Sequence, residues 1–101
     1  MRMLMNISLP VQEFNTRLRD GVVGQKMAQI IEAMKPEAIY FTDHNGQRGA
    51  VAIVEVADAS RVPALAEPWF LAFNAKIEFH IAMTPEDLKR ADLDSLQKKW
   101  G

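Results

Sequence analysis

Hydrophobic and polar residues alternate along the chain with two different periods. A two-residue period, typical of strands with one buried face, occupies residues 3–9, 38–43, 48–56 and 76–83. A helical period, with apolar residues three and four positions apart, occupies residues 11–34 and the segment that follows Ser60. The pattern therefore predicts four strands and two main helical regions.

The two central strands are joined by Asn45-Gly46, the strongest local signal for a two-residue hairpin turn. A turn at this place fixes which residues face one another across the hairpin. The predicted pairs are Asp43 with Arg48, Phe41 with Ala50, and Ile39 with Ala52. The first pair joins opposite charges, which favours this register.

Both helical regions carry residues that interrupt a helix. Gly21 and Gly24 predict that the first region is kinked, or split into two helices with the second starting near Val23. In the second region Asp58 or Ser60 is the expected N-cap. Pro68 predicts a break before a last turn at residues 69–73.

A helical tail is expected after the last strand. Thr84-Pro85 has the residues of a capped helix start, and Asp92 is expected to cap one more short helix. The last helix has an apolar side made of Leu93, Leu96 and Trp100. These side chains need an apolar partner, either the chain's own helices or a neighbouring subunit, and we favour the neighbour.

The order strand, helix, strand, strand, helix, strand predicts an α+β domain of the ferredoxin-like β-α-β-β-α-β type. Right-handed crossovers place the first strand between the third and the fourth, and leave the second at an edge. Both helical regions then cover one face of an antiparallel sheet. We expect one domain over residues 1–101, with its core in residues 1–83 and the tail in residues 84–101.

The two faces of this sheet differ in character. The face under the helices is apolar throughout: Met3, Met5, Ile7, Ile39, Phe41, Ala50, Ala52, Val54, Val56, Ile77, Phe79 and Ile81. The opposite face is mixed: Leu4, Asn6, Ser8, Ala38, Tyr40, Thr42, Val51, Ile53, Glu55, Glu78, His80 and Ala82. A homodimer that packs two such faces together would cover the apolar members and enclose the polar ones.

The order of elements resembles that of the dimeric α+β barrel superfamily. So do the run Ala64-Leu65-Ala66-Glu67-Pro68-Trp69-Phe70, the strand residues Ile77-Glu78-Phe79 and the proline-started tail at Thr84-Pro85. Muconolactone isomerase, the cofactor-free quinol monooxygenases, the EthD-like and the YCII-like proteins belong to that superfamily. The resemblance implies a homodimer with a pocket between sheet and helices. The matching residues serve packing and turns, so no catalytic residue is transferred.

Composition narrows the class of function. A net charge of −1 argues against nucleic-acid binding through bulk charge. The chain has no cysteine, which excludes disulfides, thiolate metal sites and a cysteine nucleophile, and is compatible with the cytoplasmic location that we expect. No apolar run approaches the ~20 residues that a membrane span needs. We expect no cofactor and no membrane contact.

His80 is the first candidate for chemistry, because it lies in mid-strand on the mixed face with Glu78 two residues away. In a partly dry pocket, nearby carboxylates would favour the imidazolium and tune a proton shuttle. Alternatively, His80 is only hydrogen-bonded in a dimer interface. Glu55 and Glu78 share the face without being adjacent. One of them could act as a general base, or both are solvated or salt-bridged carboxylates at strand ends, for instance with Lys76.

Glu55 and three further residues are candidates for ligand binding. Asn6 and Tyr40 could orient a ligand by hydrogen bonds, although Tyr40 could equally pack against Val51. Trp69 could wall a pocket, although aromatic residues at helical spacing more often belong to the core. A metal site at His44 and Asp43 has only two ligands and is not expected.

Two functions from different classes follow from these residues. The first is a cofactor-independent enzyme or binding protein for a small, partly apolar molecule, with proton-transfer chemistry of the isomerase or oxygenase type. In it His80 shuttles the proton, Glu78 is its electrostatic partner, and the remaining candidates bind the ligand. The second is a non-catalytic homodimeric module that regulates or scaffolds another process.

Overall fold

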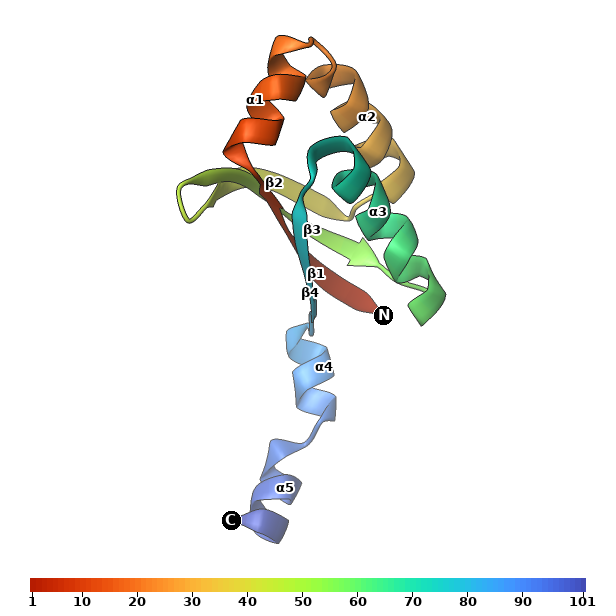
Figure 1. Cartoon of the computed structure of the whole chain (residues 1–101). Helices are drawn as coiled ribbons and strands as arrows, with labels where there is room; N and C mark the ends of the chain where they lie inside the picture. The colour runs from red at the N-terminus through yellow and green to blue at the C-terminus, as the bar shows by residue number, and fades with distance from the viewer.

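A four-stranded antiparallel sheet with helices on one face forms the body of the protein (Figure 1). The structure is a computed structural model and describes all 101 residues. The strands are β1 (Arg2–Leu9), β2 (Ala38–His44), β3 (Gln47–Glu55) and β4 (Lys76–Ile81). They lie in the order β2-β3-β1-β4, so β1 and β3 are central. This α+β arrangement is compatible with the ferredoxin-like fold expected from the sequence.

The helices cover one face of the sheet and then continue into a tail. They are α1 (Val11–Arg19), α2 (Val23–Met34), the short 3₁₀ helix η1 (Ala59–Arg61), α3 (Val62–Phe73), α4 (Pro85–Arg90) and α5 (Leu93–Trp100). The first helical region is split, as predicted, and Gly21 between its two parts has a φ of 75°. Glycine adopts this left-handed conformation without steric cost, which allows the chain to turn there.

The β2–β3 hairpin has the predicted register. Asp43 pairs with Arg48, Phe41 with Ala50, and Ile39 with Ala52. Asn45 and Gly46 have φ values of 52° and 79°, which a two-residue turn of type I′ requires at both central positions. The turn therefore sets the register, and the register decides which side chains of β3 reach the core.

The core lies between the sheet and α1, α2 and α3. Its least exposed large side chains are Met5, Ile7, Leu9, Val54, Trp69 and Phe73. Phe41 and Ile81 share the helix-covered side of the sheet by register, yet they are 56% and 64% exposed. The middle of the predicted apolar face is therefore buried. Its exposed positions are Phe41, on the edge strand β2, and Ile81, the last residue of β4.

The predicted break at Pro68 is wrong, because α3 continues through it to Phe73. Proline removes one backbone donor from a helix, and in isolation this costs about 3 kcal/mol. Two residues of the last turn, Trp69 and Phe73, are fully or almost fully buried. Their burial holds the turn in the helix against the local preference.

The tail leaves the sheet at the end of β4 and points away from the body of the protein (Figure 1). Its first helix begins with the predicted cap, in which Thr84 and Asp87 exchange backbone-to-side-chain hydrogen bonds. The bond that the Thr84 backbone N–H donates to the Asp87 carboxylate lowers the pKa of Asp87. None of the residues of α4 and α5 is buried. Leu93, Leu96 and Trp100 thus receive no cover from the chain's own helices, one of the two alternatives that the sequence left open.

Candidate functional site

The face of the sheet that carries no helices holds most of the side chains predicted to form a site. We call it the open face. The strand register aligns Tyr40, Val51, Asn6 and Glu78 in one row across all four strands. The neighbouring row holds Ala38, Ile53, Leu4 and His80. The structure thus brings Asn6 directly beside Glu78 and places His80 one row away.

These side chains are not enclosed in the single chain. Tyr40 is 72% exposed, and both Glu78 and His80 are exposed. Asn6, Tyr40, Glu78 and His80 form no hydrogen bond or ion pair with one another. These four are therefore free polar groups on a partly apolar surface, and they form a closed site only if another molecule covers them.

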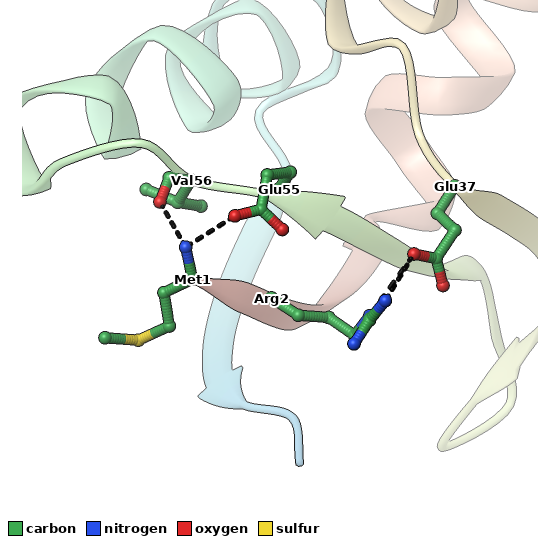
Figure 2. Close-up of polar contacts among 5 residues, drawn as sticks. All are labelled: Met1, Arg2, Glu37, Glu55 and Val56. Carbon is green, nitrogen blue, oxygen red and sulfur yellow. Dashed lines mark hydrogen bonds and ion pairs between the residues drawn. The ribbon is translucent and has the colours of Figure 1, made fainter. Parts of the chain in front are cut away.

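Glu55 lies apart from this group, at the far end of the open face. Its carboxylate accepts a hydrogen bond from the amino group of Met1 at 2.6 Å (Figure 2). The same amino group also donates to the carbonyl of Val56 at 2.8 Å. The side chain of Arg2 lies nearby and pairs with Glu37 at 3.0 Å, which raises the pKa of Arg2 (Figure 2). Glu55 is thus paired with the amino group of Met1 at the start of β1, away from Asn6, Tyr40 and Glu78.

Trp69 lies in the core and lines none of the pockets described below. It is fully buried, and its indole Nε1–H donates to the sulfur of Met34 at 3.2 Å. Its ring lies 6.1 Å from the ring of Phe73, between helices and sheet. Because the helix is unbroken at Pro68, nothing turns Trp69 toward a cavity, and it belongs to the core.

A different pocket opens between the sheet and the helices, at the hairpin end of the molecule. We call it the sheet–helix pocket. It has a volume of about 410 Å³. The side chains that give it its character are Leu9, Phe14, Met27, Phe41, Asp43 and Arg48. Pockets of a few hundred Å³ with apolar walls and a few polar groups are typical of small-molecule sites.

Arg48 is the distinctive group of this pocket. Its guanidinium carbon lies 4.5 Å from the centre of the Phe14 ring, a cation–π arrangement. Arg48 takes part in none of the three ion pairs of the structure, although it stands opposite Asp43 in the hairpin register. The ring holds the guanidinium in place while its donors stay free.

The sequence contained a signal for this pocket that the prediction did not use. The hairpin register places Asp43 and Arg48 on the same side of the sheet as Ala50 and Ala52, the otherwise apolar side. Two charges at the end of an apolar face indicate a polar opening beside a core. The approach of Phe14 and Met27 from α1 and α2 depends on tertiary packing and has no such signal.

Neither a cluster of possible metal ligands nor a similarity to a known protein indicates the function of this site. Asp43 and His44 are consecutive in β2 and point to opposite faces, and no group of three or more possible ligands lies together. No known family model matches the chain, and no curated protein matches it either. The helices are all too short or too polar to span a membrane.

Proposed function

We propose that the protein binds a small, partly apolar anion, such as an aromatic carboxylate, in the sheet–helix pocket. The observation that carries this proposal is the free guanidinium of Arg48 stacked on Phe14 at the mouth of an apolar pocket. A planar guanidinium matches a carboxylate with two parallel hydrogen bonds. Phe41 and Met27 provide the apolar surface for the rest of the ligand.

The ligand is still a small, partly apolar molecule, as the sequence predicts, but the proposed site lies on the other side of the sheet. The open-face residues were predicted to hold the ligand, whereas the apolar walls and the free cation favour the opposite side of the sheet. Proton transfer by His80 and Glu78 stays a prediction that depends on covering the open face. A binding function needs no such cover.

Phenylacetate, which combines a ring with a carboxylate, tests the proposal. Replacing Arg48 by Met retains an apolar side chain over Phe14 and removes the charge. A hydrogen bond to a charged group contributes about 1.5–3 kcal/mol. We therefore expect Arg48→Met to weaken phenylacetate binding by about 10- to 100-fold in an NMR titration.

Arg61→Met is the matched control, because Arg61 lies exposed in η1 and outside the pocket. It should leave the affinity unchanged, and benzyl alcohol, which lacks the charge, should bind the unmodified protein weakly. Equal affinities of the Arg48→Met and Arg61→Met proteins would contradict the proposal. So would phenylacetate shifts confined to residues outside the pocket.

We also propose that the working form is a homodimer in which two open faces pack together. Leu4, Val51 and Ile53 give this face an apolar centre on the two middle strands, which no helix of the chain covers. The tail supports the same view, since its leucines and Trp100 lack cover within the chain. The alternative of a non-catalytic dimeric module shares this assembly, and the phenylacetate experiment separates the two.

A lysine at position 53 tests the assembly. Ile53→Lys places a charge at the centre of the proposed interface, and an unpaired buried charge costs about 3–5 kcal/mol. We expect the dissociation constant of the dimer to rise at least about 100-fold, measured by light scattering across a dilution series. Leu71→Lys is the control, because Leu71 is 73% exposed on α3, away from the open face. A monomeric unmodified protein at every concentration would refute the dimer.

A further inference from the structure

A second cavity lies on the open face, at the same hairpin end as the sheet–helix pocket but on the other side of the sheet. It has a volume of about 270 Å³. Seven residues line it and none of them is hydrophobic. Four of them supply the groups that matter here: Ser8, His44, Lys76 and Glu78. We call this cavity the polar cup.

The strand register explains how three of these side chains come together. Ser8 at the end of β1 pairs with Lys76 of β4 on one side and with Gly49 of β3 on the other. Glu78 follows Lys76 by two residues, so it points to the same face. Residues two positions apart in a strand lie roughly 6–7 Å apart along the backbone and point to the same face. The side chains of Lys76 and Glu78 therefore start from backbone positions with this spacing.

Gly49 allows the fourth group to enter. The imidazole of His44 lies over Gly49: a Cβ at this position would stand 2.1 Å from Cδ2 of His44. Gly49 is buried as a result. Nε2 of His44 lies 3.3 Å from the carbonyl oxygen of Ala50 and, when protonated, donates to it. In the neutral ring this leaves Nδ1 as an acceptor for another group.

The two charges of the cup are unengaged. Neither Lys76 nor Glu78 takes part in the three ion pairs of the structure, and neither forms a side-chain hydrogen bond. The ammonium of Lys76 can only donate hydrogen bonds, and an ionised Glu78 can only accept them. A ligand that satisfies both groups must carry an acceptor anion and a donor close together.

We propose that the polar cup binds a small hydroxy- or amino-carboxylate. The ligand's carboxylate pairs with Lys76, and the hydroxyl or ammonium on its adjacent carbon donates to Glu78. The two hydrogen bonds, each about 2.8 Å long, together with the ligand between them span roughly 8 Å, enough to join neighbouring side chains on one strand. Most of the cup's lining surface is polar, with apolar surface including the ring of Pro10, so it favours compact polar molecules over aromatic ones.

This site is independent of the anion pocket proposed above. It is also separate from the proposed dimer contact, because Ser8 and Lys76 lie one row beyond Val51, at the hairpin end of the open face and outside its apolar centre. The two cavities open on opposite faces of the sheet, and the residues that carry each proposal differ. In an NMR titration, binding to the cup shifts the amides of Ser8 and Lys76. Binding to the sheet–helix pocket shifts those of Phe14 and Phe41. Failure of one proposal is therefore distinguishable from failure of the other.

The test is a ¹⁵N NMR titration of the protein, residues 1–101, with L-lactate and with glycine. Acetate and methylammonium, which each carry only one of the two groups, are the comparison probes. We expect saturable shifts in the cup with at least one of the first pair, and affinities at least about 10-fold weaker for the single-group probes. Lys76→Met should reduce the affinity for the bound probe by 10-fold or more.

Lys26→Met is the matched control, since Lys26 is exposed on α2 and does not line the cup. Lys76 is itself exposed on an edge strand, so its replacement should leave the fold intact, which the spectrum of the free variant verifies. Any of three results overturns the proposal: no cup shifts with L-lactate or glycine at tens of millimolar, equal binding of acetate, or equal affinity of the two lysine variants.

Discussion

Replacing Trp69 by Ala is expected to lower the free energy of unfolding by about 3–5 kcal/mol. Trp69 is fully buried in α3, its ring lies 6.1 Å from that of Phe73, and its Nε1–H donates to Met34. Removing the ring leaves a cavity between helices and sheet and deletes this polar contact. Because small domains have a total stability of about 5–15 kcal/mol, the variant should be strongly destabilised or unfolded.

Chemical denaturation followed by circular dichroism measures this effect. Leu71→Ala is the matched control, because Leu71 lies two residues away in the same helix and is 73% exposed. Its change should stay within about 0.5 kcal/mol. Trp69→Phe should fall between the two, since it retains most of the volume and loses the donor. If Trp69→Ala and Leu71→Ala behaved alike, the placement of Trp69 in the core would be wrong.

Gly49→Ala is the second large expected effect, although it adds only one methyl group. A Cβ at this position would stand 2.6 Å from the carbonyl oxygen of Ile7 and 2.1 Å from Cδ2 of His44. Both distances are shorter than van der Waals contact. The imidazole can turn away, but the Ile7 carbonyl belongs to the backbone of β1, the central partner of β3. We expect a loss of about 1–3 kcal/mol, the usual cost of overpacking.

Gly24→Ala is the control of opposite sign. Gly24 lies in α2, and a Cβ there would meet nothing within 4 Å. Alanine should therefore stabilise the protein by about 0.4–1 kcal/mol, by restricting the unfolded chain. The difference between the two melting temperatures reports the environment of each glycine. A Gly49→Ala protein as stable as the unmodified one would contradict the close approach of β1, β3 and His44.

Residues near one another in the sequence determined most of the secondary structure. The two-residue period of residues 3–9 and 76–83 is a property of the strands themselves, and Asn45-Gly46 fixed the hairpin because both positions need a positive φ. Gly21 split the first helical region for a similar reason. Such signals depend only on neighbouring residues, so they could be interpreted without knowing the rest of the fold.

The local rule failed where burial opposed it. Pro68 predicted a break, yet α3 continues because Trp69 and Phe73 are held in the core. The same packing buries Trp69, whose Nε1–H donates to Met34, and Glu55 pairs with the amino group of Met1. Spacing along the sequence could not predict these partners, since Met34 and Met1 are distant in the sequence from Trp69 and Glu55.

What the sequence determined by itself is the set of elements, the register of the hairpin and the division of the sheet into an apolar and a mixed face. Only the tertiary structure decided where cavities form. Phe14 reaches Arg48 because α1 packs over the hairpin end, and His44 covers the strand because position 49 has no side chain. Periodicity is a property of one segment, whereas a cavity depends on how the side chains of several segments fill the space between them.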